Sequence, residues 1–137
     1  MSEASNKRIV IQLENFRKAL GRLEEMLQRN EDDAVRDAVV LRFLFTFEMA
    51  WKAAYYYLAA RGERIEKSSW AVLREAFTAH LIKDVAKWDD LRKYRNVIGH
   101  EYDERQAIEI VAYVRAHAVP AFRELYNTLQ LEHGRNP

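Results

Sequence analysis

The first part of the chain carries large apolar side chains at a regular helical spacing. Successive positions are four, three, four, three and four residues apart, and they are Ile9, Leu13, Phe16, Leu20, Leu23 and Leu27. On an α-helix this spacing gathers them on one face, whereas a strand would send alternate side chains to opposite faces. The segment therefore predicts a long amphipathic helix that must pack against other helices.

The next segment is apolar on more than one face. It begins near Asp33, after the polar residues 30–33, because acidic side chains favour the positive end of a helix. It ends near Arg61, where Gly62 can form a left-handed cap. One apolar row contains Val40, Leu44, Phe47, Trp51, Ala54 and Leu58, and another contains Val39, Phe43, Ala50 and Tyr57. A helix about 43 Å long is hard to cover on every side in one small domain, so we expect a homodimer or partner interface here.

Three further helices are predicted downstream. Ser68 or Ser69 can cap a third helix with Trp70, Leu73 and Phe77 facing inward. Asp84 can cap a fourth with an inward set of Val85, Trp88, Leu91 and Ile98, and Gly99 would follow its end. Asp103 and Gln106 have the spacing of a capping box for the last helix. Its apolar face is Ala107, Val111, Val114, Ala118, Phe122, Leu125 and Leu129, and Pro120 predicts a kink.

These elements define the expected fold class. The chain of 137 residues has only four glycines and two prolines, which leaves little material for tight turns or a strand-rich fold. No repeat or linker divides the sequence. We expect an all-α, antiparallel up-and-down bundle of four to five helices forming one domain over residues 1–137, with a frayed tail at about 132–137.

Composition limits the classes of function. The absence of cysteine excludes disulfides, thiolate metal sites and cysteine nucleophiles. His80, His117 and His133 lack metal-ligand spacing, so we expect no metal and no cofactor. The 22 basic residues nearly balance the 21 acidic ones, so any RNA substrate should make only local, transient contact. No stretch approaches the about 18 apolar residues that suggest a membrane span, and we expect a cytoplasmic protein.

Residues 95–102 form the strongest candidate for chemistry. Arg95 supplies a planar set of donors suited to a phosphate, and His100 supplies an imidazole, whose ordinary pKa of about 6.5 suits proton transfer at neutral pH. The pair fits a metal-independent ribonuclease, and a symmetric dimer would bring a second histidine. The simpler interpretation is architectural: His100 ties a turn, Arg95 pairs with an acid such as Glu48, and Asn96 satisfies turn backbone.

A family resemblance favours the chemical interpretation. The spacing of Arg95, Asn96, His100 and Tyr102 resembles the signature of the HEPN superfamily. Residues 45–52, Phe-Thr-Phe-Glu-Met-Ala-Trp-Lys, resemble a stretch of the branch known as nucleotidyltransferase substrate-binding proteins. The segment 73–77, Leu-Arg-Glu-Ala-Phe, followed by Trp88, continues that branch in order, and the resemblance covers roughly residues 13–129.

The resemblance implies a function for each residue of the motif. Proteins of this branch are dimeric helical bundles encoded beside a minimal nucleotidyltransferase, the MNT protein. In toxin-antitoxin pairs the HEPN protein is a ribonuclease toxin, and the MNT antitoxin neutralises it, in some pairs by adenylylating the tyrosine. Arg95 would polarise the phosphate and Asn96 would orient it. His100 would transfer the proton, and Tyr102 would accept the modification. Glu48 would orient Arg95 or Lys52.

Two other functions remain compatible with the sequence. The chain could be a non-catalytic subunit that presents a nucleotide or another substrate to a nucleotidyltransferase, and the nearly neutral net charge of +1 favours this. Alternatively, it could be a helical dimer without an active site, in which residues 95–102 only form a turn. RNA cleavage would separate the first hypothesis from both of these.

Overall fold

The structure is a computed structural model that describes residues 2–98 and 102–135. Its helices are α1 (Glu3–Leu27), α2 (Asp33–Ala60), α3 (Ser69–Thr78), α4 (Val85–Ile98), α5 (Glu104–Tyr113) and α6 (Val119–Arg135). A π-helical segment, η1 (Val114–Ala118), joins α5 directly to α6, so the described residues make five helical rods. The predicted all-α fold class is confirmed.

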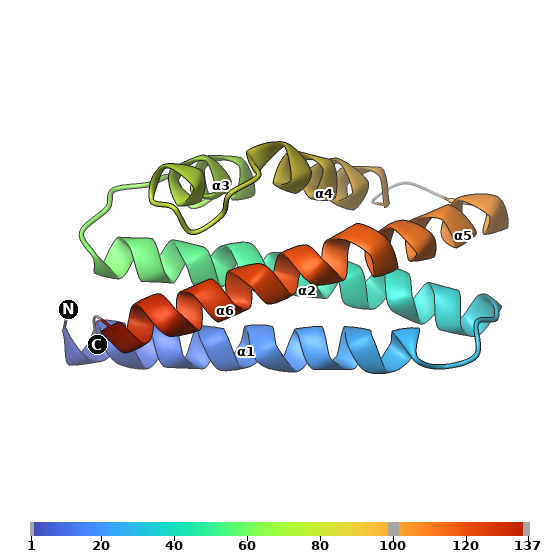
Figure 1. Ribbon diagram of the computed structural model, residues 1–137, viewed down its shortest axis with the longest axis horizontal. Coiled ribbons are helices and arrows are strands. Elements are labelled where there is room, and N and C mark those ends of the chain that lie inside the picture. The colour runs from blue at the N-terminus through green and yellow to red at the C-terminus, as the bar shows by residue number, and fades with distance from the viewer. Residues whose placement is uncertain (1, 99–101, 136–137) are drawn as a thin grey trace.

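The rods run up and down along one long axis (Figure 1). α1 and α2 are antiparallel, α3 and α4 follow one another back along α2, and the rod formed by α5, η1 and α6 returns beside α1 and α2. The two ends of the chain therefore lie at the same end of the bundle. The α1–α2 turn and the beginning of α5 lie at the other end, so the beginnings of α2 and α5 are neighbours.

The amphipathic stripe of α1 forms one side of the core. All six of its predicted inward residues are buried, which confirms the heptad interpretation. Ser2 caps the helix by accepting a hydrogen bond from the backbone N–H of Ser5 at 3.1 Å. Full burial of each large apolar side chain contributes about 1.5–3 kcal/mol relative to exposure, so packing of this face holds α1 in place more than its own helix propensity does.

α2 is the central helix and contacts α1, α3, α4, α5 and α6. Asp32 caps its start by accepting from the N–H of Val35 at 2.8 Å, and Gly62 follows its end with the predicted positive φ of 90°. Both apolar rows are buried except for the partly exposed Leu44. The rows therefore need no second subunit to cover them. The exposed apolar residues of α2 are instead Leu41 and Phe45, at 68% and 57% exposure.

The orientation predicted for α3 needs correction. Ser68 caps it and Leu73 is buried as expected, but Trp70 and Phe77 are 52% and 45% exposed. The buried face is formed by the smaller Val72 and Ala76 together with Leu73. Small side chains let this short helix lie close to α2, which turns the wide rings toward the edge. There the guanidinium of Arg74 covers the indole of Trp70, 5.2 Å from the ring centroid.

The remaining helix boundaries follow the predicted caps. Asp84 accepts from the N–H of Lys87 at 3.0 Å, and Asp103 forms the predicted capping box with Gln106. The inward residues of α4 at 88, 91 and 98 and all seven predicted for the last rod are buried. Val85, also expected inward on α4, is only partly buried.

The irregularity expected at Pro120 takes the form of η1. Proline has no N–H and its ring crowds the carbonyl one turn earlier, so the widened π-helical turn just before it accommodates both effects. The rod continues as α6 to Arg135, into the segment expected to fray. Gly99, expected just past α4, lies outside the described residues. None of the helices in the described ranges has the length and apolar character needed to cross a bilayer.

Candidate functional site

The predicted motif spans the connection between α4 and α5. Arg95 and Asn96 lie in the last turn of α4, and Tyr102 directly precedes Asp103, the cap of α5. His100 falls outside the described residues, as do its two neighbours. The two sides of the motif are thus described, and the predicted proton-transfer residue lies in the sequence between them.

Arg95 is held at the end of α4 by two side chains. Its Nη2 lies 3.2 Å from Oε1 of Glu48 on α2, and its Nη1 donates to Oδ1 of Asn96 at 3.3 Å. The Arg95 side chain is nevertheless 46% exposed. The predicted pairing with Glu48 is confirmed. An arginine held in this way keeps part of its donor fork free for an anion from solvent.

Glu48 contacts three donors at once. In addition to Arg95, its Oε2 accepts from the indole N–H of Trp51 at 3.2 Å and lies 4.0 Å from Nζ of Lys52. Both basic partners predicted for this carboxylate are therefore present. Two cations share one carboxylate, so the cluster keeps a net positive charge. Exposed ion pairs contribute only about 0–1 kcal/mol to stability, and orientation of Arg95 is the larger consequence.

Tyr102 makes a separate set of contacts. Its ring packs against the core, and Asp37 of α2 lines the same hollow as its phenol. Burial of the phenol, followed by the negative charge of Asp37 and a hydrogen-bonding interaction with it, raises the pKa of Tyr102 above its ordinary value. The hydroxyl is therefore protonated throughout the neutral range and is a weak nucleophile without a proton acceptor.

The two described sides of the motif contact different parts of α2. Arg95 meets Glu48, whereas Tyr102 meets Asp37, eleven positions earlier on the same helix. At 1.5 Å per residue these two carboxylate-bearing positions are about 16 Å apart along the helix axis. The structure thus brings Arg95, Asn96 and Glu48 together, and it does not place Tyr102 in that cluster.

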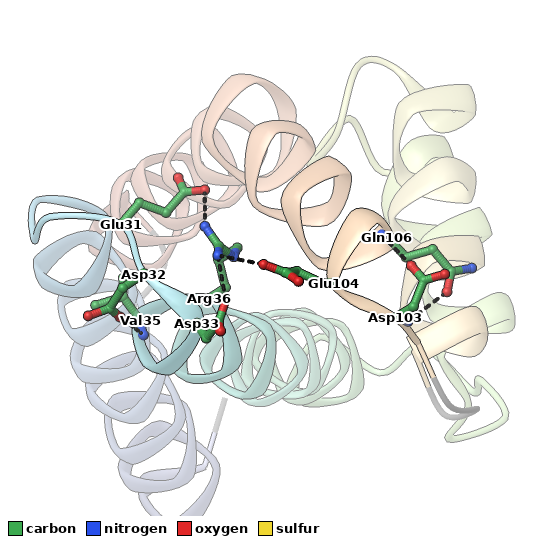
Figure 2. Close-up of polar contacts among 8 residues, drawn as sticks. All are labelled: Glu31, Asp32, Asp33, Val35, Arg36, Asp103, Glu104 and Gln106. Atoms are coloured by element: carbon green, nitrogen blue, oxygen red, sulfur yellow. Dashed lines mark hydrogen bonds and ion pairs between the residues drawn. The ribbon is translucent and has the colours of Figure 1, made fainter.

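Two residues near Tyr102 had no sequence signal. Arg36 lies one position before Asp37, and its side chain is only 13% exposed. It pairs with Asp33 at 2.6 Å, with Glu31 at 3.1 Å and, across to α5, with Glu104 at 3.7 Å (Figure 2). Neither Arg36 nor Asp37 belongs to a recognisable motif. Only the topology, which returns the start of α5 to the start of α2, makes them neighbours of Tyr102.

Comparison with known proteins identifies the family of this bundle. The family described as nucleotidyltransferase substrate binding protein like matches residues 11–131. The chain belongs to this family. This confirms the branch of the HEPN superfamily indicated by the sequence. No curated protein matches the chain.

Solved structures share the fold of this family member. A protein of Thermus thermophilus is 27% identical, with a TM-score of 0.70, and the match covers 85% of this chain and 97% of that one. A toxin-antitoxin with AMP-PNP is 16% identical, with a TM-score of 0.73 and coverage of 90% and 97%. A mutant of the toxin-antitoxin MntA-HpeT is 17% identical, with a TM-score of 0.74 and the same coverage. At such identities the two toxin-antitoxin structures show similarity of fold.

Proposed function

We propose that this family member is the ribonuclease toxin of a toxin-antitoxin pair, with Arg95 and His100 as catalytic residues. The observation that carries the proposal is the half-exposed guanidinium of Arg95, which Glu48 and Asn96 hold immediately before the segment that contains His100. A fixed cation with free donors is what a phosphodiester requires as charge accumulates on its oxygens. The similarity in fold to toxin-antitoxin structures agrees with this proposal.

The proposed reaction needs no metal. The imidazole of His100 takes the proton of a ribose 2′-hydroxyl, the 2′-oxygen attacks the adjacent phosphorus, and the bond from phosphorus to the 5′-oxygen breaks. The leaving oxygen receives a proton from an acid, which the second His100 of a dimer would supply. Arg95 stabilises the negative charge on the non-bridging oxygens, and Asn96 orients the phosphate.

The partner in this proposal is a nucleotidyltransferase antitoxin of the MNT type. The family description names a nucleotidyltransferase, and the two toxin-antitoxin relatives include one crystallised with AMP-PNP. The partner would adenylylate Tyr102 and thereby neutralise the toxin. Tyr102 lines two hollows of about 250 Å³ and about 220 Å³, so its side chain borders surface that a second protein could contact.

Cleavage of RNA by the purified chain tests the proposal directly. We expect end-labelled RNA to be cut in buffer containing EDTA, with 2′,3′-cyclic phosphate ends, because the proposed chemistry uses only side chains. Preincubation with the nucleotidyltransferase and ATP should abolish cutting. Intact RNA at every concentration of the unmodified protein would contradict the ribonuclease function.

We predict that Phe45→Asp converts a dimer into a monomer. Phe45 and Leu41 are the exposed apolar side chains of α2, and they share a helix face with Glu48, the partner of Arg95. A dimer formed through this face would place two copies of the motif near one another. Sedimentation at micromolar concentration should show the change, accompanied by loss of RNA cleavage. Phe77→Asp, on the exposed edge of α3, is the matched control and should remain dimeric.

The alternative function is a non-catalytic subunit that presents a nucleotide or another substrate to a nucleotidyltransferase. It is favoured by the nearly neutral net charge of +1, because a free ribonuclease gains from a basic surface. The ion pair between Glu48 and Arg95 also fits it, because this pair holds part of the guanidinium without any substrate. Nucleotide or partner binding without RNA cleavage would favour this alternative.

A further inference from the structure

The polar hollow beside Tyr102 has chemical features that the ribonuclease proposal does not use. It has a volume of about 250 Å³ and lies where the first turns of α2 meet the start of α5. Asp37 and Tyr102 both line it. Asp37 is exposed and Tyr102 is half-buried, and the charge of Asp37 acts on the phenol strongly enough to raise its pKa. A carboxylate therefore shares this hollow with the oxygen that would have to react.

The surrounding contacts fix the two helix ends that carry these groups. Next to Tyr102, the backbone N–H of Asp103 donates to Gln106 at 2.9 Å and its carboxylate accepts from the N–H of Gln106 at 2.8 Å (Figure 2). Next to Asp37, Arg36 spans from Asp33 on its own helix to Glu104 on α5. The capping box fixes where α5 begins, and the Arg36–Glu104 ion pair links that beginning to the start of α2.

We infer that Asp37 is a catalytic residue for nucleotidylation of Tyr102, in which its carboxylate orients the phenol and accepts its proton. This inference rests on the proposed function of Tyr102 as the modification acceptor. The phenol oxygen attacks the α-phosphorus of a nucleoside triphosphate and a new oxygen–phosphorus bond forms. The bond to the β-phosphate breaks, pyrophosphate leaves with the electron pair, and the phenol proton passes to Asp37. Protein kinases use an aspartate in this way for the hydroxyl that they phosphorylate.

The charges around the hollow make such an acceptor necessary. Asp33 and Arg36 line it from α2, and Asp103 and Glu104 line it from the start of α5. From α4, Lys93 lines the adjoining hollow that Tyr102 also borders. Carboxylates outnumber cations, so a free phenolate would be disfavoured there. Transfer of the proton to Asp37 during attack avoids that phenolate, and general base catalysis of this kind typically contributes about 10²–10⁴-fold.

An electrostatic role alone and a proton-accepting role predict opposite effects of Asp37→Asn. Asparagine keeps an oxygen that can accept the phenol hydrogen bond, but it carries no charge and takes no proton. Because the charge of Asp37 raises the pKa of Tyr102, its removal lowers that pKa and increases the phenolate fraction at a given pH. If Asp37 acts only through its charge, nucleotidylation of Tyr102 should be faster in Asp37→Asn. If Asp37 accepts the proton, nucleotidylation should be slower in this variant.

The test measures transfer of label from α-³²P-ATP by a nucleotidyltransferase of the MNT type, the proposed partner. We expect Tyr102→Phe to abolish labelling and Asp37→Asn to slow it by about a hundredfold or more. The rate for Asp37→Asn should also rise by about tenfold per pH unit from pH 6 to 9, because only phenolate reacts, while the wild-type rate changes much less. Glu109→Gln removes a carboxylate from the adjoining hollow that Tyr102 also borders and should stay close to the wild-type rate.

A second measurement needs no partner protein. Acetylation of Tyr102 by N-acetylimidazole, followed by peptide mass spectrometry, reports the reactivity of the same oxygen. Asp37→Asn should slow it and Asp37→Glu should restore part of the rate, with circular dichroism confirming that each variant is folded. Equal or faster reaction of Asp37→Asn in both assays would overturn the inference alone. Absence of label on the wild-type chain would overturn Tyr102 as acceptor, and with it the role of Asp37.

Discussion

Replacing His100 by alanine is expected to lower the rate of RNA cleavage by about a hundred- to ten-thousandfold. Alanine can neither take the proton of the 2′-hydroxyl nor return one to the leaving oxygen. In a dimer both roles belong to the two copies of His100, so one substitution removes the base and the acid together. Growth arrest on expression should be lost with cleavage. Single-turnover cleavage of labelled RNA, at saturating protein, isolates this chemical step.

Arg95→Ala should weaken the same reaction through a different group. It removes the cation that stabilises the phosphate, and loss of one such donor typically costs about 10²–10³-fold. Arg95→Lys keeps the charge but not the planar fork, so it should recover only part of the rate. His117→Ala is a matched control because His117 is exposed on η1 and packs against Tyr113. If His100→Ala and Arg95→Ala both remained as toxic as the wild type, the ribonuclease site would be wrong.

The helices could be predicted because their signals are local. The stripe of α1 and the capping box at Asp103 each specify a face or an end within a few residues. The prediction of which face of α3 points inward was wrong because two faces of that helix are apolar. Its spacing favours Trp70 and Phe77, whereas close packing on α2 favours Val72 and Ala76. The choice between them depends on the distance between helices, which spacing along one helix does not contain.

The candidate site also has one contact that the sequence predicts and one that it does not. The pairing of Arg95 with Glu48 was predictable because Glu48 lies in the stretch 45–52 that resembles the family and its carboxylate suits a guanidinium. The contact of Tyr102 with Asp37 was not, because it requires the start of α5 to return to the start of α2. The separation of about 16 Å between Glu48 and Asp37 follows from their spacing on the predicted helix, but only the contact of Tyr102 with Asp37 connects it to the motif. Because of this separation, adenylylation of Tyr102 would block the approach of RNA to the motif at a distance from Arg95.

Phe122→Ala is expected to be the most destabilising single truncation in the bundle. Phe122 is fully buried, and its ring centroid lies 6.4 Å from Phe16 on α1, 6.0 Å from Phe43 on α2 and 5.8 Å from Trp88 on α4. Truncation of a buried phenylalanine leaves a cavity and typically costs about 3–5 kcal/mol. Because small domains have only about 5–15 kcal/mol of net stability, the variant should be close to unfolding.

Urea unfolding followed by circular dichroism measures this loss at one fixed protein concentration, because the stability of a protein that dimerises depends on concentration. Phe77→Ala, which removes the same side chain from a 45% exposed position, should cost about 1 kcal/mol or less. Equal losses for the two variants would contradict the packing of α1, α2 and α4 around Phe122. The comparison also separates folding from chemistry: Phe122→Ala should reduce toxicity by lowering the amount of folded protein, whereas His100→Ala should abolish it at unchanged stability.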